Sequence, residues 1–287
     1  MYKILFIGIG TMGFPMAGYL SKNNDVSVYN RSKEKVEKWL STYKGYSLNS
    51  LTEINKDYDF IISCIGNDND LKDITISESG CLNLLKKDSI FIDHSTVSPK
   101  LVIDLEKKFS EKKIHFLDAP VSGGQSGAEN GTLSIMVGGH KQAFIKSEEL
   151  LKSYGKKIKF MGNVGSGQLT KIINQVCIAG LIQGLSEAIY FMKQTDLAPE
   201  DVLEVISSGA AQSWQMENRF STMVNNEFDF GFAVDLMRKD LSIAFNQAQE
   251  YGIDLEVTKI VDDFYSEIQK IGGNRFDTSS LVKRLIP

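Results

Sequence analysis

The sequence has few of the residues that build disulfide frameworks and metal sites. It contains three cysteines and three histidines in 287 residues. The cysteines, at positions 64, 81 and 177, are odd in number, widely spaced and without a CxxC pair, so they predict neither a disulfide framework nor a zinc site. The histidines, at positions 94, 115 and 140, lack the spacing of metal ligands. We therefore expect a reduced, cytoplasmic protein without a bound metal.

An excess of positive charge is also missing. The chain has 32 Lys and Arg against 36 Asp and Glu, a net charge of −4, and this argues against a nucleic-acid partner, which would call for a basic face.

Residues 1–8 enter a strand at once and lack the layout of a secretory signal. The mostly apolar run 172–182 is interrupted by Asn174 and Gln175, so we expect it to fall short of a membrane span.

The composition, 42% hydrophobic and 24% charged, is typical of a soluble globular protein with one large domain or two ordinary ones. In the first half, short apolar runs alternate with amphipathic ones, the pattern of a parallel sheet with helices on both faces. We predict an α/β fold with a Rossmann-type, doubly wound sheet over residues 1–162. The predicted strands are 3–8, 26–29, 60–64, 90–93, 115–118, 132–137 and 158–161, and the predicted helices are 14–22, 32–39, 68–74 and 99–111.

The pattern changes after Gly162. Residues 167–193 fit one long helix that is apolar around most of its circumference, and regular strands are hard to find beyond it. Further helices are predicted at 199–208, 236–250 and 255–271. We place a domain boundary near 162–166, so residues 163–287 are expected to form an all-helical domain led by the long helix.

A glycine loop, Gly8-x-Gly10-x-x-Gly13, lies between the first predicted strand and the first predicted helix. In a dinucleotide-binding loop the first glycine permits the tight turn, the second lets the backbone approach the pyrophosphate, and the third allows close packing of helix on strand. The helix N-terminus then faces the phosphates. A glycine-rich turn of structural use only is the alternative.

The end of the second strand distinguishes NAD from NADP. NAD binding favours an acidic residue there, whereas this chain has Asn30, Arg31 and Ser32. Arg31 is suited to pair with a 2′-phosphate, and its two neighbours are suited to donate hydrogen bonds. We predict NADP(H) as the preferred cofactor and NAD(H) as the alternative. Arg31 as a solvated surface residue remains open.

The segment 118–139 contains six glycines after Ser122. Closely spaced backbone N–H groups can form a concave anion site, and a substrate carboxylate is its natural occupant, with Ser122 adding a hydroxyl. A plain loop and hairpin is the alternative.

Lys171 lies in an apolar stretch, where a lysine is costly to bury without a partner or a task. Gly167, Lys171 and Asn174 are spaced i, i+4, i+7 and share one helical face, and the glycine would leave room for cofactor or substrate. Lys171 is placed to protonate a carbonyl oxygen as hydride arrives, with Asn174 orienting that oxygen or the lysine. Alternatively, the lysine stem lies along apolar surface with its head in water.

Together these motifs resemble the β-hydroxyacid dehydrogenase family, which includes 3-hydroxyisobutyrate dehydrogenases and glyoxylate/succinic semialdehyde reductases. Residues 8–17 (GIGTMGFPMA) resemble the family's cofactor loop, and residues 118–139 its substrate-binding signature. Residues 165–174 (GSGQLTKIIN) resemble its catalytic helix, and GF at 231–232 with KDL at 239–241 its later motif. The matches run almost from end to end of the chain.

The resemblance implies Lys171 as the catalytic acid/base and Asn174 as a residue that helps to place the substrate. It implies that Ser122 and the two glycines after it, Gly123 and Gly124, hold the carboxylate of a small substrate. The residues that it implies for cofactor binding are Gly8, Gly10, Thr11, Met12, Gly13, Ile65, Gly66, Thr96, Lys239 and Asp240.

Two departures from the family pattern concern the site. Gln175 follows Asn174 where the family often has a second asparagine, and residues 64–71 (CIGNDNDL) replace a more usual Leu-Pro run. Trp214 either narrows the substrate pocket or belongs to the core.

The expected function is hydride transfer between a nicotinamide cofactor, NADP preferred, and a small β-hydroxyacid or its semialdehyde. A glyoxylate/succinic semialdehyde reductase is the nearest alternative. A non-catalytic NADP-binding sensor or assembly module is an alternative of another class, which the presence of Lys171, Asn174 and Ser122 disfavours. An imine reductase fits poorly, because those enzymes commonly carry another residue at the lysine position. The resemblance also implies a homodimer or homotetramer.

Overall fold

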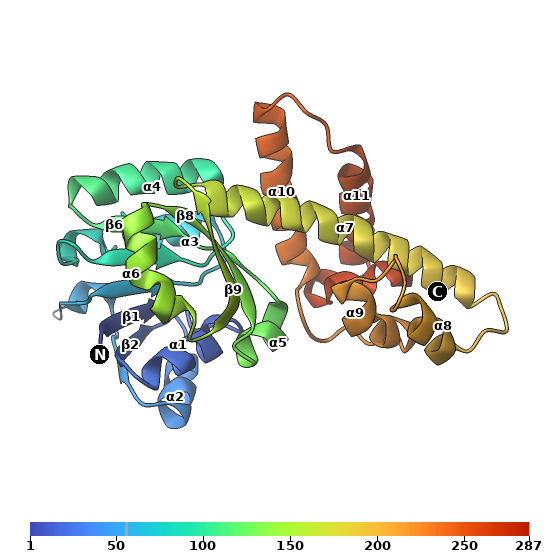
Figure 1. Ribbon diagram of the computed structural model, residues 1–287, viewed down its shortest axis with the longest axis horizontal. Coiled ribbons are helices and arrows are strands. Elements are labelled where there is room, and N and C mark those ends of the chain that lie inside the picture. The colour runs from blue at the N-terminus through green and yellow to red at the C-terminus, as the bar shows by residue number, and fades with distance from the viewer. Residues whose placement is uncertain (55–56, 287) are drawn as a thin grey trace. The chain divides into compact units, whose positions relative to one another are not determined.

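A computed structural model describes residues 1–54 and 57–286 of the chain, and it divides into two compact units (Figure 1). Unit 1 comprises residues 1–171 and unit 2 residues 172–287. The division falls inside α7 (Ser166–Met192), one turn beyond the predicted boundary region at 162–166. Lys171 is therefore the last residue of unit 1.

Unit 1 is built around a sheet of nine strands, as far as its described residues show. The strand order is β3-β2-β1-β4-β5-β6-β8-β7, with β9 beside β8, and the strands from β3 to β6 are parallel. The strands are β1 (Lys3–Ile7), β2 (Asp25–Tyr29), β3 (Tyr46–Ser47), β4 (Phe60–Ser63), β5 (Ile90–Asp93), β6 (His115–Asp118), β7 (Val121–Ser122), β8 (Leu133–Gly139) and β9 (Gly155–Gly162).

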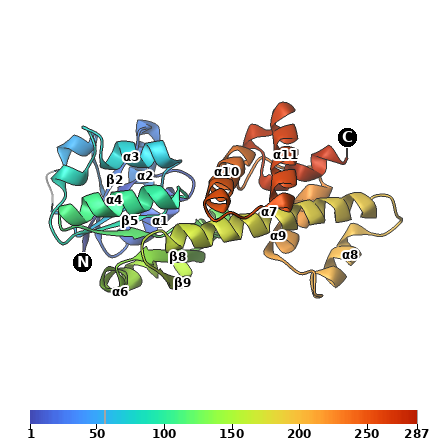
Figure 2. The same ribbon diagram turned by 90° about the horizontal axis from the view of Figure 1, so that it is seen from above.

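Helices cover both faces of this sheet (Figures 1 and 2). Because successive side chains of a strand point to opposite faces, Ile4 and Phe6 of β1 join one core cluster while Leu5 and Ile7 join the other. The first cluster includes side chains of α1, α2 and α6, and the second side chains of α3 and α4. The helices are α1 (Gly13–Ser21), α2 (Lys33–Thr42), α3 (Asp68–Thr75), α4 (Pro99–Glu111), α5 (Gly124–Glu129) and α6 (Lys141–Leu151), with short 3-10 turns at Leu51–Glu53 and Leu82–Leu84.

The predicted Rossmann-type fold is confirmed, with two corrections. The sheet is mixed rather than parallel throughout, because β8 runs antiparallel to both β6 and β7. The prediction also missed β3, β7, α5 and α6. Residues 121–129 form β7 and α5 because Gly123 and Gly124 adopt positive φ values of 134° and 61°, which turn the chain sharply from strand to helix.

Unit 2 is built from helices. It holds most of α7 together with α8 (Pro199–Ile206), α9 (Trp214–Val224), α10 (Val234–Glu250) and α11 (Glu256–Lys270), and short 3-10 helices at Gly273–Arg275 and Thr278–Arg284. One core cluster joins α7, α10 and α11, and a second joins α7 and α9. The predicted all-helical region is confirmed, but α9 was not predicted.

The helix α7 serves as the spine of unit 2. Its 27 residues have the length and apolar composition of a membrane span, although the sequence predicted that it would fall short. Buried core helices of soluble proteins can have the same length and apolar composition. Ala179, Ile182 and Ile189 are fully buried in the two clusters of unit 2, so this face of α7 is a core face.

Candidate active site

The predicted cofactor residues of unit 1 gather at the carboxyl edge of the parallel strands. The last residues of five adjacent strands lie in one row, because Ile7 is in register with Tyr29 and Ser63, and Asp93 with Ser63 and Asp118. The segments that follow these residues carry the glycine loop, Asn30 to Ser32, Ile65 and Gly66, and Thr96. The order of β2, β1 and β4 also places the glycine loop where the chain reverses its direction across the sheet, the usual ligand position in open α/β folds.

The glycine loop has the shape that a dinucleotide needs. A Cβ on Gly8, whose φ is +92°, would meet the Cys64 carbonyl, and a Cβ on Gly13 would meet the Gly8 carbonyl, so packing explains both glycines. A Cβ on Gly10 would meet nothing within 4 Å. Packing therefore does not require glycine at position 10, and its open side fits the approach of a pyrophosphate. Thr11 is exposed, and Met12, the N-cap of α1, provides no side-chain cap for the helix N-terminus.

Arg31, in the segment after β2, forms an ion pair that the sequence did not reveal. Arg31 Nη1 lies 2.9 Å from Asp70 Oδ1 of α3, and the arginine side chain is 78% exposed. Asn30 Nδ2 donates to the Ser32 carbonyl at 3.3 Å, and Ser32 is the N-cap residue of α2 without a side-chain cap hydrogen bond. Arg31 is thus anchored at the sheet edge and open to solvent.

The segments after β4 and β5 are tied together by a buried aspartate. Asp93 Oδ1 accepts hydrogen bonds from Ser63 Oγ at 2.7 Å and Ser95 Oγ at 2.6 Å, and Ser95 Oγ accepts from Ile65 N at 2.9 Å. These bonds join the two segments that follow β4 and β5. The half-buried Thr96 follows Ser95 directly, and the exposed Gly66 follows Ile65.

A second buried carboxylate fixes the first turn of α7. Asp118, the last residue of β6, accepts hydrogen bonds from Gly165 N at 2.8 Å and from Gln168 N at 2.9 Å. Burial raises the pKa of Asp118 to about 7, while these two hydrogen bonds lower it and the nearby Asp93 raises it. A carboxylate at a helix N-terminus satisfies amides that have no partner within the helix.

The expected role of Gly167 is wrong. A Cβ at this position would meet the carbonyl oxygens of Met136 and Asp118 and the Asp118 carboxylate, so the missing side chain serves close packing of α7 on the sheet. It does not leave room for cofactor or substrate.

Lys171 lies on α7 three residues after Gln168 and is 7% exposed. This burial disfavours the alternative in which its amine extends into water. In unit 1, the same compact body therefore carries the glycine loop, Thr96 and a lysine withdrawn from solvent.

The glycine-rich segment 118–139 is not one anion-binding loop. Gly138 and Gly139 lie in β8, where a Cβ would meet Asp118 Oδ1 and Leu117 respectively, so they are packing glycines. Ser122 lies at the end of β7, opposite Ser134 of β8, and a Cβ on Gly124 would meet nothing within 4 Å. The candidate carboxylate site is thereby reduced to Ser122, Gly123 and Gly124.

In unit 2, two hydrogen bonds and one ion pair join three predicted site residues and Gln175 in one row. Asn174 Nδ2 donates to Gln175 Oε1 at 2.8 Å, and Gln175 Nε2 donates to Asp240 Oδ2 at 2.7 Å. Asp240 Oδ1 lies 2.9 Å from Lys239 Nζ. Gln175 and Asp240 are buried, so Gln175 links the candidate substrate residue of α7 to the candidate cofactor residues of α10.

Trp214, the first residue of α9, is 42% exposed and is not a core residue. The Arg219 guanidinium lies 4.9 Å from the centroid of its ring and 4.9 Å from that of Phe230. Arg219 Nε also donates to the buried Asp277 at 3.0 Å. Arg219 therefore holds the indole ring from one side, and Trp214 stays a candidate for the pocket wall.

Comparisons with known proteins bear on the family and the fold of this chain. A family model for the NAD-binding domain of 6-phosphogluconate dehydrogenase matches residues 3–162, and one for the NAD-binding region of NADP-dependent 3-hydroxyisobutyrate dehydrogenase matches residues 165–285. An uncharacterised oxidoreductase of Shewanella frigidimarina is 47% identical over 99% of this chain and 98% of its own. The 2-hydroxy-3-oxopropionate reductase of Escherichia coli is 31% identical over 99% of this chain and 97% of its own.

A solved 3-hydroxyisobutyrate dehydrogenase from Salmonella typhimurium has the same fold, with a TM-score of 0.88 at 22% identity over 99% of this chain and 100% of that one. The chain belongs to the β-hydroxyacid dehydrogenase family. It is an NAD(P)-binding oxidoreductase of the kind that acts on hydroxyl groups.

Within this candidate site, the sequence analysis missed Asp118, Gln168 and the link made by Gln175. The sequence signal for the first two was weak: Asp118 follows the apolar Phe116 and Leu117, and Gln168 lies in the same apolar stretch as Lys171. Only tertiary structure reveals that these polar groups meet one another.

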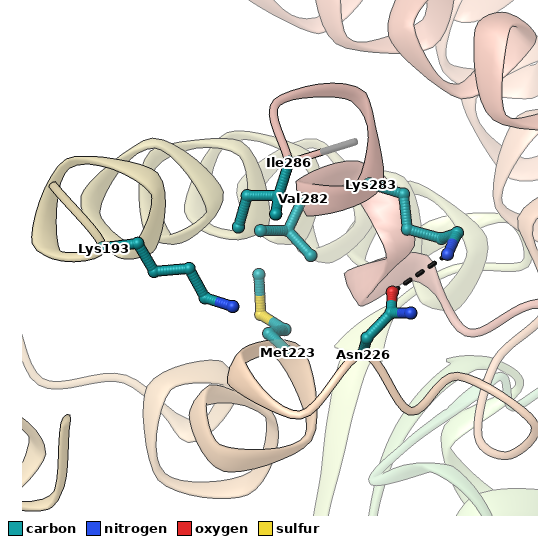
Figure 3. A pocket seen from close by; sticks show the side chains of 6 residues that line it. All are labelled: Lys193, Met223, Asn226, Val282, Lys283 and Ile286. Carbon is teal, nitrogen blue, oxygen red and sulfur yellow. Dashed lines mark hydrogen bonds between the residues drawn. The ribbon is translucent and has the colours of Figure 1, made fainter.

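A pocket of about 140 Å³ in unit 2 contains none of the predicted site residues (Figure 3). Both of its amines are already hydrogen-bonded, Lys193 Nζ to the Val224 carbonyl at 3.0 Å and Lys283 Nζ to Asn226 Oδ1 at 2.9 Å. We assign it no function. Among residues 1–54 and 57–286, no group of three or more His, Cys, Asp or Glu side chains is arranged to hold a metal ion.

Proposed function

We propose that this chain is an NADP-preferring oxidoreductase that transfers hydride between the nicotinamide and the carbinol carbon of a small β-hydroxyacid or its semialdehyde. The observation that carries the proposal is the buried Lys171, which shares a compact unit with the glycine loop and Thr96. When bound, the nicotinamide supplies or accepts the hydride. Lys171 donates a proton to the carbonyl oxygen in reduction and accepts the hydroxyl proton in oxidation.

The remaining residues bind and orient. Ser122 and the amides of Gly123 and Gly124 hold the substrate carboxylate, and Asn174 orients the reacting oxygen. A protonated Lys171 stabilises the developing alkoxide charge. Thr96 contacts the nicotinamide end of the cofactor, Ile65 and Gly66 line its path, and Lys239 reaches it with Asp240 in support. Trp214 narrows the substrate pocket.

The preference for NADP(H) over NAD(H) is attributed to Arg31. It is exposed after the end of β2, where residues 30–32 include no carboxylate that would repel a 2′-phosphate. The Asp70 carboxylate, 2.9 Å from the guanidinium, competes with a 2′-phosphate for Arg31.

Replacement of Lys171 tests the mechanism. For Lys171→Ala we expect kcat to fall by roughly 10²- to 10⁴-fold, the usual contribution of a general acid/base, while the Kd of NADPH changes less than about threefold. Steady-state kinetics and NADPH fluorescence titration measure the two effects. Lys193→Ala, which removes an amine just beyond the end of α7, is the matched control and should keep wild-type turnover. Turnover of Lys171→Ala within about twofold of wild type would reject the proposal.

The alternative function, NADPH-dependent reduction of glyoxylate or succinic semialdehyde, is supported by the similarity to 2-hydroxy-3-oxopropionate reductase. A screen of NADPH and NADP+ with glyoxylate, succinic semialdehyde, 3-hydroxyisobutyrate, serine and threonine separates the two readings. Tight NADPH binding without turnover of any of them would favour a non-catalytic sensor or assembly module instead.

We also propose that the protein is a cytoplasmic homodimer or homotetramer. Ile173, Leu181, Tyr190 and Phe191 of α7 are exposed, and so large an apolar surface on one helix favours burial against a second copy. Sedimentation should then give two or four times the chain mass of 32.0 kDa. A monomer at micromolar concentration would contradict this.

A further inference from the structure

The side chain of Gln168 is completely buried, and its amide bonds to two backbone groups of a distant loop. Gln168 Nε2 donates to the Ser95 carbonyl at 2.8 Å, and Gln168 Oε1 accepts from Val97 N at 3.1 Å. Ser95 and Val97 are the two neighbours of Thr96. One amide therefore holds the backbone on both sides of the residue expected at the nicotinamide.

The backbone of Gln168 is fixed just as firmly. Its N–H donates to Asp118 Oδ2 at 2.9 Å, while Asp118 Oδ1 accepts from Gly165 N at 2.8 Å. Next to it, Gly167 packs against the carbonyl oxygens of β6 and β8 with no space for a side chain. The first turn of α7 thus cannot slide along the sheet without losing these contacts.

Lys171 follows Gln168 by three residues, so the two side chains lie on the same side of α7, about one turn apart. All of these residues belong to unit 1. The loop with Thr96 and the turn that leads to Lys171 are consequently joined by one side chain.

We propose that Gln168 is a positioning residue, which sets the place of the Lys171 amine relative to the nicotinamide site by clamping the backbone around Thr96. The inference rests on the proposed function of Lys171. A displacement of a reacting group by about 1 Å costs on the order of 10²-fold in rate, and we expect loss of the clamp to cause a displacement of that size.

Two substitutions separate positioning from general stability. Gln168→Met keeps a similar volume but removes both hydrogen bonds. Gln168→Glu keeps the acceptor for Val97 N and regains a donor toward the Ser95 carbonyl only when its carboxyl group is protonated. Thr170→Ala is the control, because the Thr170 hydroxyl bonds only to the Ser166 carbonyl within α7.

For Gln168→Met we expect kcat to fall by about 10²-fold, with the Kd of NADPH and KM each within about threefold of wild type. The kcat of Gln168→Glu, divided by that of wild type at the same pH, should rise toward one as the pH is lowered and the glutamate becomes protonated. The same ratio should stay constant for Gln168→Met, and Thr170→Ala should match wild type throughout.

Amide hydrogen exchange provides a readout that does not depend on activity. The Val97 amide should exchange at least tenfold faster in Gln168→Met, because its acceptor is lost. Faster exchange with unchanged kcat would overturn the positioning role, and unchanged exchange would overturn the clamp itself. If Lys171→Ala keeps its turnover while exchange at Val97 still accelerates in Gln168→Met, the proposed function fails and the clamp stands as a structural feature only.

Discussion

In the proposed function, side chains rather than backbone distinguish NADP(H) from NAD(H) at the carboxyl edge of the sheet, because part of the backbone there is already hydrogen-bonded. Gly8 N donates to the Tyr29 carbonyl at 2.8 Å, and Cys64 N donates to the Ile7 carbonyl at 2.9 Å. Discrimination between the two cofactors is left to groups that reach beyond this edge. Arg31 is an exposed cation at this edge, and Asp70 is its partner.

Arg31→Ala should lower kcat/KM for NADPH by about 10- to 100-fold and leave kcat/KM for NADH nearly unchanged, since a hydrogen bond to a charged group contributes roughly 1.5–3 kcal/mol. Asp70→Asn should shift the preference further toward NADPH, because the competing carboxylate is removed. Lys33→Ala, an exposed cation two residues away, is the control. Equal losses with both cofactors would show that Arg31 does not read the 2′-phosphate.

At the scale of elements, α7 contains one glycine that close packing requires and another that it does not require. Gly167 packs against the carbonyl oxygens of Met136 and Asp118, whereas a Cβ on Gly180, in the same helix, would meet nothing within 4 Å. The same substitution should therefore have opposite effects at the two positions.

We expect Gly167→Ala to destabilise the protein by about 1–3 kcal/mol through overpacking against backbone. Gly180→Ala should stabilise it by roughly 0.5–1 kcal/mol, the difference in helix propensity between the two residues. Urea denaturation followed by circular dichroism measures both. A neutral Gly167→Ala would mean that α7 is not held tightly against the sheet.

Local signals predicted many of these elements well. The helix Pro99–Glu111 begins where the sequence predicts, because Pro99 suits a first helical turn and Ser98 caps it by accepting from Leu101 N. The strands Ile90–Asp93 and His115–Asp118 are short apolar runs with clear ends. By contrast, α6 begins at Lys141 after His140, which makes no side-chain cap hydrogen bond. The helix α9 does have a cap, because Ser213 Oγ accepts from Met216 N, but the prediction did not use this signal.

The candidate site was predictable only in part, for a related reason. Glycine spacing and the lysine in an apolar stretch are visible along the chain. Apart from contacts with immediate neighbours, the hydrogen bonds of this site join residues that lie between 47 and 73 positions apart in the sequence. They are made by the Asp118 carboxylate, the Gln168 amide and the Gln175 side chain. Such pairs leave no periodic pattern in one sequence. The packing role of Gly167 was missed because a glycine on a helix face can serve close packing as well as the approach of a ligand.

At the scale of the whole molecule, two compact units have separate cores and carry separate sets of candidate site residues. Unit 1 holds the glycine loop, Thr96 and Lys171, and unit 2 holds the row from Asn174 to Lys239. The core of unit 1 also contains two buried titratable groups with opposite effects on its stability, His94 and Asp118.

His94 is held neutral in this core. Its Nδ1 lies 2.6 Å from the Ala119 carbonyl, which only accepts, so Nδ1 carries the proton and Nε2 accepts from the Tyr154 hydroxyl at 2.8 Å. Burial lowers the pKa of His94 to about 4, against a lesser opposing effect of the hydrogen bond to Ala119. Between pH 4 and 6.5 the unfolded state thus binds the additional proton at this residue, and stability rises with pH.

Asp118 acts in the opposite direction. Its pKa is raised to about 7 by burial, so the folded state binds the additional proton above the ordinary value of 3.8, and stability falls as pH rises toward 7. In the wild type the two effects should nearly cancel between pH 4 and 6.5. In His94→Gln the effect of Asp118 is no longer opposed by His94, so the free energy of unfolding should fall, relative to that of the wild type, by about 1.4 kcal/mol per pH unit.

Fluorescence of the buried Trp39 in a Trp214→Phe background reports the unfolding of unit 1, since the chain has only these two tryptophans. Urea unfolding at pH 4.5, 5.5 and 6.5 gives the slope. Equal slopes for wild type and His94→Gln would refute the opposing roles of the two groups.

The most direct test of the whole account is a crystal structure of the protein with NADP+ and a small β-hydroxyacid. The account predicts Lys171 Nζ within about 3 Å of the substrate hydroxyl oxygen, a hydrogen-bond distance. It also predicts the substrate carboxylate on Ser122 and the amides of Gly123 and Gly124. An amine directed into solvent, with another proton donor beside that oxygen, would contradict the account.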